Sequence, residues 1–459
     1  MTNPLLIPEL KELLANNDSE TIQKFCQQNH PGTVAELISG LEPSEIWQVL
    51  HLLDPPLRAE IFSFFDLNKQ VELATGPSRK DMARLLEEMP PDDRADLVRK
   101  LDESLLEEIL PLVAKAERED IRKLVSYEER TAGAVMSTDY AVLRPEMTVA
   151  QAIEQLRLQA PSKETIYYIY VIDENRKLIG FVSLKDLITA KPTQLVRDIM
   201  HTDAIFARVN DDQEVVAKLI EKYDLIAVPI VDENGVLVGI VTHDDAIDII
   251  RQEQTEDMEK FMGIAGTHEV SNYLQTPWWK HFTKRVYWIV GLAALGLVSG
   301  LVIHSFEATL MNLLILALYM PMVADTGGNT GSQAATVVVR ALALGQLRPK
   351  DFLKVLLKEF QVSLGLAVIL GLLSFGKVLF LSRTSEIPGG YSLAMIAAAI
   401  AVALGLQVIT ATLIGAALPL LVARFKHDPA VVASPALTTI VDITGLFIYF
   451  CTAKVFLGV

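Results

Sequence analysis

The chain has 459 residues, of which 51% are hydrophobic and 21% charged, and its mean hydropathy is +0.31. Residues 1–276 hold 50 acidic and 28 basic side chains, whereas residues 277–459 hold 7 and 13. An acidic, water-soluble front is therefore joined to an apolar back, which excludes a purely soluble enzyme and a disordered chain. Two cysteines, Cys26 and Cys451, exclude a disulfide scaffold, and the acidic front favours cations over nucleic acid as partners.

Residues 1–130 show helical periodicity and no strand pattern. Short apolar stretches alternate with turns rich in proline and acidic residues, as around Pro43 and Pro90. We predict short helix pairs that stack as an acidic solenoid. Asp92 and Asp96 lie one helical turn apart and would share a face.

Residues 131–250 contain an internal repeat. Met136–Asp139 recurs as Met200–Asp203, and Val171–Asp186 recurs as Ile230–Asp245. The pattern of short strands and helices resembles a tandem pair of CBS modules, an α+β fold. In CBS families the ending Gly-x-x-Ser/Thr-x-x-Asp often holds an adenosine ribose, so the resemblance implies nucleotide contacts at Ser183, Asp186, Thr242 and Asp245. A purely structural, empty pair is the alternative.

Another acidic cluster follows the repeat, and residues 251–276 form a predicted linker helix that joins the soluble front to the membrane part. A solvated helix face is the ordinary explanation of such a charge run. Packed against the acids of the first domain, however, these groups would repel one another unless a cation lay between them. The cluster consists of Asp244, Asp245, Asp248, Glu253, Glu256, Asp257 and Glu259.

Residues 277–459 contain five apolar stretches long enough to cross a bilayer, which predicts an all-α membrane domain. They are Val286–Phe306, Leu310 to about Ala341, Phe360–Leu381, Ser392–Val422 and Val432–Leu457. No signal peptide is expected at Met1–Asn17, and lysine and arginine concentrate on one set of flanks. We therefore expect a multi-pass cell-membrane protein with cytoplasmic N-terminal domains and its C-terminus outside, and a homodimer, because five spans make a thin wall for a pore.

Polar residues at membrane depth are the functional candidates. Asp442 lies in an otherwise apolar final span, and a carboxylate there usually marks an ion path. The second span contains Gly328, Asn329 and Thr336, where irregular backbone could expose carbonyls to a hydrated ion, with close helix packing as the alternative. Oxygen ligands of this kind suit hard cations such as Mg²⁺, Ca²⁺ or Mn²⁺. Weaker membrane candidates are Glu307, Asp325 and Glu359.

This organisation resembles the MgtE family of magnesium channels over nearly the whole chain. The residues that carry the resemblance are Gly327-Gly328-Asn329 through Gly345, Phe306-Glu307, and the stretch Asp428-Pro429-Ala430…Ser434-Pro435…Asp442. The resemblance implies that Asp442 binds a hydrated magnesium ion in the pore, with Asp428 and Ser434 near its mouth. Ser434 departs from the glycine or asparagine of many members, which leaves the ligands at the pore mouth open.

The resemblance also implies a magnesium sensor between the acidic domain and the CBS pair, and a plug role for the linker helix. The matching positions are Asp92, Asp96, Asp224, Asp245, Asp248, Glu253 and Glu256, with Asp257 beside them, and Glu60 and Asp212 match less closely. We expect a non-enzymatic Mg²⁺ uptake channel that high internal Mg²⁺ closes and that ATP modulates. A proton-coupled transporter, or one with broader selectivity that includes Co²⁺ and Mn²⁺, is the alternative.

Overall fold

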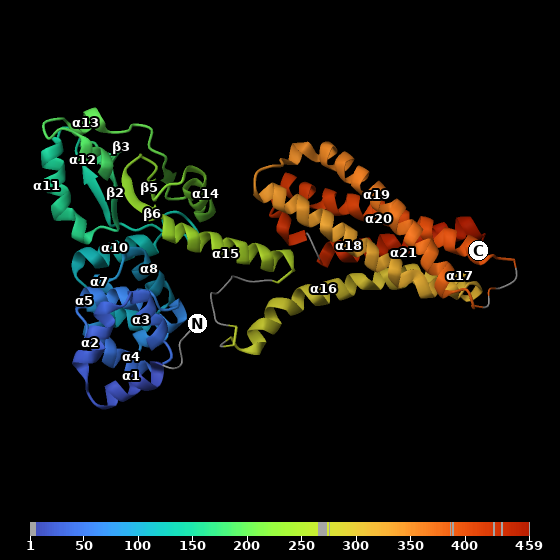
Figure 1. Ribbon diagram of the computed structural model, residues 1–459, viewed down its shortest axis with the longest axis horizontal. Coiled ribbons are helices and arrows are strands. Elements are labelled where there is room, and N and C mark those ends of the chain that lie inside the picture. The colour runs from blue at the N-terminus through green and yellow to red at the C-terminus, as the bar shows by residue number, and fades with distance from the viewer. Residues whose placement is uncertain are drawn as a thin grey trace. The chain divides into compact units, whose positions relative to one another are not determined.

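The computed structural model describes residues 6–264, 273–274, 276–385, 387, 390–425, 427–432 and 435–458. The chain divides into two compact units, Met1–Glu253 and Gln254–Val459, which are each described by themselves below (Figure 1). The first unit contains the acidic helical domain and the repeat, and the second contains the apolar helices.

The acidic domain is a stack of short helices. Helices α3, α4, α5 and α8 each begin with a proline, which suits the first turn because that position needs no hydrogen-bond donor. Most helices pack on the one two places further along, as α4, α6, α8 and α10 do, so the predicted solenoid is confirmed. The helices are α1 (Leu6–Ala15), α2 (Ser19–Gln28), α3 (Pro31–Ile38), α4 (Pro43–His51), α5 (Pro55–Ser63), α6 (Leu67–Ala74), α7 (Arg79–Glu88), α8 (Pro91–Lys100), α9 (Glu103–Ile109) and α10 (Lys115–Val125).

The repeat folds into two matching modules, each with a three-stranded sheet. In each sheet the first two strands are parallel and the last two antiparallel, in the orders β1-β2-β3 and β4-β5-β6. The first module comprises β1 (Tyr140–Leu143), α11 (Val149–Gln159), β2 (Thr165–Ile172), β3 (Leu178–Ser183) and α12 (Leu184–Thr189). The second comprises α13 (Val196–Ile199), β4 (Ala207–Arg208), α14 (Gln213–Tyr223), β5 (Ala227–Val231), β6 (Leu237–Thr242) and the start of α15 (His243–Phe261).

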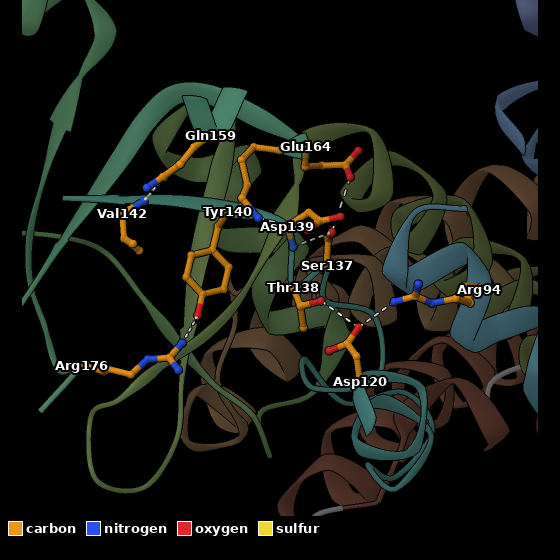
Figure 2. A network of polar contacts seen from close by, with 11 residues as sticks. Arg94, Asp120, Ser137, Thr138, Asp139, Tyr140, Val142, Gln159, Glu164 and Arg176 are labelled. Carbon is orange, nitrogen blue, oxygen red and sulfur yellow. Dashed lines mark hydrogen bonds and ion pairs between the residues drawn. The ribbon is translucent and has the colours of Figure 1, made fainter. Parts of the chain in front are cut away.

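Buried contacts join the acidic domain to this pair of modules. Ala95 of α8 and Leu124 of α10 belong to the same hydrophobic core as Val228 of β5 and Val241 of β6. A polar network runs beside this core: Arg94 donates to Asp120 at 2.8 Å, and the Thr138 hydroxyl donates to the same carboxylate oxygen at 2.9 Å (Figure 2). These direct contacts between side chains hold α8 and α10 against the start of the first module.

The second unit contains five long helices, α16 (Trp278–Ser305), α18 (Ile315–Ala343), α19 (Phe352–Leu381), α20 (Leu393–Arg424) and α21 (Pro435–Leu457), with the short α17 (Glu307–Asn312) before α18. Within the described residues, all of these except α18 and the short α17 are long and apolar enough to cross a membrane. The second span was expected to be a helix from Leu310. The helical structure is interrupted at Leu313–Leu314, however, and α18 begins only at Ile315. Five spans remain a prediction, because α18 carries many polar residues.

The second span is one continuous helix, contrary to the expectation of irregular backbone around Gly328. The backbone from Ile315 to Ala343 is helical, with Pro321 as a position that donates no hydrogen bond, so the carbonyls at Gly327 and Gly328 are used within the helix. The glycines instead allow close packing: a Cβ on Gly415 of α20 would lie only 2.2 Å from the carbonyl oxygen of Gly331. The alternative of close packing through small residues therefore fits the structure better.

Candidate functional site

One face of α18 carries a polar stripe. Asp325, Asn329, Gln333, Thr336 and Arg340 follow one another at intervals of three or four residues, and all five are exposed in the single chain. The opposite face, which includes Gly327, Gly328 and Gly331, is buried against α20 and α21. A stripe with a carboxylate and four other polar side chains cannot face lipid, so water or another protein surface must cover it.

Asp442 lies half-buried in α21, the helix that packs against α18. Its charged neighbour is Asp325 of the polar stripe. Gly328 comes close to the same helix, because a Cβ on it would lie 3.4 Å from the side chain of Thr438. The structure thus brings Asp442, Gly328 and the α18 stripe, with Asn329, to adjoining helices of one bundle.

The other predicted membrane residues are placed differently. Glu307 opens α17 and pairs with His304 at 3.2 Å on an exposed surface. Glu359 lies half-buried on α19, which packs on α20. Ser434 lies outside the described residues. Within the described part of the chain, Asp325 acts on Asp442, and neither Glu307 nor Glu359 does so.

Asp428 and Glu256, which were assigned to cation binding, share a lysine instead. The Lys260 Nζ lies 2.9 Å from Glu256 Oε1 and 2.9 Å from Asp428 Oδ2. Partial burial disfavours the ammonium form, but these hydrogen bonds outweigh it and raise the pKa of Lys260 above its usual range. Asp428 also accepts the backbone N–H of Ala430 at 2.9 Å. Sequence reasoning missed Lys260, because a lysine one turn after a glutamate looks like an ordinary surface pair.

Acids from the solenoid and from both modules gather where these parts meet. Burial raises the pKa of Asp92 well above its usual value, and the charges of Asp245, Asp93 and Glu164 add to the effect. Burial likewise raises the pKa of Asp93 and Glu164 to about 7 and that of Asp245 to about 6. We call Asp92, Asp93, Glu164, Asp244 and Asp245 the junction cluster.

The junction cluster holds negative charge that protein groups do not fully compensate. The Asp92 Oδ1 atom is buried and has no hydrogen-bond partner among the described residues. Nevertheless, no group of three or more His, Cys, Asp or Glu side chains in the described part is arranged to hold a metal ion directly. The cluster is thus a group of like charges with one unpaired carboxylate oxygen among the described residues.

Two members of the cluster were missed by sequence reasoning. Asp93 follows Asp92 in the first turn of α8, so its position next to a predicted residue was the available signal. Glu164 lies immediately before β2, and its Oε2 lies 3.4 Å from the Ser137 hydroxyl (Figure 2). Only the pairing of the first module with the solenoid brings this residue to the cluster, and no local pattern in the sequence indicated it.

The remaining sensor candidates have local roles or add negative charge beside the junction cluster, as Asp96 does for Asp93 and Asp248 for Asp245. Asp96 pairs with Arg99 at 3.0 Å, and burial raises the pKa of its carboxyl. Asp212 caps the start of α14 by accepting from Glu214 N, and Asp224 ends the same helix in a left-handed conformation. Glu253 accepts from Gln213 Nε2 at 2.7 Å. Glu60, Asp248 and Asp257 are exposed.

The two predicted ribose motifs are in different surroundings. Asp186 accepts from the backbone N–H and hydroxyl of Ser183, and its Oδ2 lies 3.1 Å from His201 Nε2. Partial burial opposes ionisation, but these hydrogen bonds lower the pKa of Asp186. Asp245 accepts in the same way from Thr242, yet it belongs to the junction cluster. His201, the partner of Asp186, also lines a cavity.

That cavity has a volume of about 200 Å³ and lies between the two modules. Aromatic rings line it, including Tyr168, Phe181 and His201, and the last two are stacked with centroids 5.1 Å apart. Tyr170 also lines it, and its hydroxyl is buried with no hydrogen-bond partner in the described part of the chain. Flat rings with one unsatisfied hydroxyl, beside a carboxylate, suit a nucleobase and its ribose.

Comparisons with known proteins agree with this architecture. Residues 320–452 match the MgtE model, described as a divalent cation transporter, residues 29–130 match the MgtE intracellular N domain, and residues 132–192 and 196–252 match CBS domains. The chain is 37% identical over 455 residues to the magnesium transporter MgtE of Thermus thermophilus, covering 98% of each chain. It is 36% identical over 374 residues to that of Bacillus subtilis, covering 81% of this chain and 80% of the relative.

Two solved structures resemble the first unit. One is the soluble part of a magnesium transporter, with 34% identity and a TM-score of 0.52, covering 54% of this chain and 97% of the other. The second is the cytosolic domain of the Mg²⁺ channel MgtE in complex with ATP, with 37% identity and a TM-score of 0.50, covering 52% of this chain and 98% of the other. Relatives similar along almost the whole chain, together with the matched models, show that the chain belongs to the MgtE family of divalent cation transporters.

Proposed function

We propose that this chain forms a homodimeric channel that admits Mg²⁺ to the cytoplasm. The observation that carries the proposal is the exposed polar stripe of α18 beside Asp442, within a bundle whose other long helices are apolar. A second copy facing this stripe would enclose it in a polar path and keep it from lipid. The two named relatives are magnesium transporters, and the chain is similar to them over most of their length. This similarity supports Mg²⁺ as the cargo.

The path would recognise a hydrated ion. Mg²⁺ gives up its water reluctantly, so oxygen acceptors that bind its water shell can attract it without stripping it. Two Asp442 carboxylates near a dimer axis would repel each other, and an entering dication offsets that repulsion. Occupation must stay weak enough for the ion to leave.

We further propose that the domains are those predicted: residues 1–130, 131–250, 251–276 and 277–459. The first two would lie in the cytoplasm and the C-terminus outside. Mg²⁺ at the junction cluster would favour the arrangement in which the solenoid packs on the CBS pair, because it binds that arrangement better than a separated one. High internal Mg²⁺ would then close the channel.

The decisive experiment is Mg²⁺ flux into liposomes that contain the full-length protein. Asp442→Asn keeps the size of the side chain and removes its charge, so flux should fall to background while the protein stays folded. The control is Glu359→Gln, which neutralises a carboxylate outside the polar group and should retain flux. Normal uptake by the Asp442→Asn variant would refute Asp442 as the pore site. Repeating the measurement with a pH gradient distinguishes a channel from a proton-coupled exchanger.

ATP is the proposed ligand of the cavity between the modules. The ATP complex of a relative's cytosolic domain and the aromatic lining of this cavity support the assignment. ATP should raise the melting temperature of the full-length protein in detergent by mass action, and Asp186→Ala should abolish the increase. Glu233→Ala, a change in an exposed turn of the second module, is the matched control. An unchanged ATP response in Asp186→Ala would exclude a ribose contact there.

A further inference from the structure

Gln407 lies in the middle of α20 and is completely buried among α18, α20 and α21. Its side-chain Nε2 donates to the backbone carbonyl of Val441 at 2.9 Å. The Thr444 hydroxyl donates to the same carbonyl at 3.0 Å. The peptide group that immediately precedes Asp442 is therefore fixed by two side chains, one of which comes from another helix.

Two glycines make room for the amide of Gln407. A Cβ on Gly327 of α18 would lie 2.4 Å from Nε2, and a Cβ on Gly445 of α21 would lie 2.5 Å from the same atom. Any other residue at either position would push the amide aside, because real Cβ atoms do not approach so closely. Gly327 precedes Gly328 and Asn329, and Gly445 lies three residues after Asp442, so the amide is packed between the segments proposed to border the ion path.

Stability alone does not account for a glutamine at this position. Its Oε1 is buried and has no hydrogen-bond partner in the described residues, and an unpaired buried polar atom destabilises a fold. An apolar side chain of the same length would fill the space without that cost. The hydrogen bond to Val441 is thus the feature that only a side-chain donor supplies.

We propose that Gln407 is a positioning residue for Asp442. By holding the Val441 carbonyl, it fixes the rotation and height of α21 against α20, and with them the direction of the Asp442 carboxylate. This inference rests on the proposed function, in which Asp442 borders the ion path. Removing the bond should weaken attraction of Mg²⁺ more than it slows the maximal flux.

The test compares two substitutions in the full-length protein reconstituted in liposomes, with Mg²⁺ itself as the probe. Gln407→Met keeps the length and apolar volume and loses the donor, whereas Gln407→Asn keeps an amide that is one methylene too short to reach Val441. A positioning role predicts that both raise the half-saturating Mg²⁺ concentration, by about 10- to 100-fold, as loss of groups that orient metal ligands does. A packing role predicts a normal Gln407→Met variant and an impaired Gln407→Asn variant.

Gly445→Ala is a second route, because its Cβ would displace the amide while Gln407 remains. Gly445→Ala should raise the half-saturating Mg²⁺ concentration as Gln407→Met does. If Gln407→Met fails to fold, the result for Gly445→Ala tests the positioning role on its own. Asp442→Asn is measured in parallel. If Asp442→Asn transports normally, the proposed function fails; if it is inactive while Gln407→Met and Gly445→Ala keep the wild-type half-saturating concentration, only the positioning role is refuted.

Discussion

Lys260 pairs with two acidic side chains that were predicted to bind cations. Its ammonium lies between Glu256, which was predicted for the sensor, and Asp428, which was predicted for the pore mouth. The Glu256 side chain is only 11% exposed, and the nearby ammonium stabilises its charge. The next residue, Phe261, packs against the cluster formed by Ala335, Ala411, Leu437 and Val441. The end of α15 is therefore fastened to the apolar helices by a contact that needs no Mg²⁺.

Substitution of Lys260 tests whether this contact helps to close the channel. Lys260→Met removes the charge and keeps the length, so the end of α15 should loosen and the open fraction should rise at low internal Mg²⁺. A loss of about 1 kcal/mol would correspond to roughly a fivefold rise. Lys260→Arg keeps the charge and is the control. Single-channel recording without internal Mg²⁺ measures the open fraction, and equal values for the two variants would contradict the prediction.

At the scale of the elements, glycines decide how closely α18 and α20 approach. Gly415 faces the carbonyl oxygen of Gly331, and Gly331 in turn faces the carbonyl of Ala411. The obstacle in both cases is backbone, which cannot rotate away as a side chain can. These glycines set the helix separation that keeps α18 in place with its polar stripe on the opposite face.

Gly415→Ala should therefore destabilise the membrane unit, because the added methyl group would overlap the Gly331 carbonyl at 2.2 Å. Overpacking of this kind costs about 1–3 kcal/mol. Gly365→Ala on α19 is the matched control, since a Cβ there meets nothing within 4 Å. Melting temperatures in detergent measure the difference: the control should match the wild type, and a Gly415→Ala variant that melted with it would show that the helices can separate freely.

At the scale of the whole molecule, the junction cluster makes packing of the solenoid on the CBS pair sensitive to both protons and cations. Asp93 and Glu164 have a pKa raised to about 7, chiefly by burial, against about 4 in an unfolded chain. A carboxyl with a raised pKa binds more protons when packed, so its packing is favoured at low pH and weakened as pH rises through the folded pKa.

In the absence of Mg²⁺, we expect packing at the junction to weaken as pH rises from 6 to 8. The change should be about 1–2 kcal/mol across the cluster. Added Mg²⁺ should reduce this dependence, because it compensates the same charges. Hydrogen-exchange protection factors for amides of α8 in the full-length protein measure the effect. Protection factors that increase with pH, or that do not change with pH when a chelator removes Mg²⁺, would mean that these acids are not packed together.

Element type and order could be predicted from the sequence, because helical periodicity, β-branched runs and apolar length are local properties. The solenoid was predicted from proline-rich turns, and the pair of modules from an internal repeat. Local signals failed where they conflict: around Gly328, glycines that suggest irregular backbone lie inside the continuous helix α18.

The sequence by itself determined the two-part organisation, the family resemblance and the polar residues of α18 and α21, because charge and hydropathy are carried by each residue wherever it packs. Only the tertiary structure decided which of these groups meet. It places Glu164 near Asp92, although 72 positions of the chain separate them. It also pairs Lys260 with Glu256 and Asp428. The amide of Gln407 donates a hydrogen bond to Val441. Such pairings depend on how helices and modules pack over long sequence separations, and no local pattern records them.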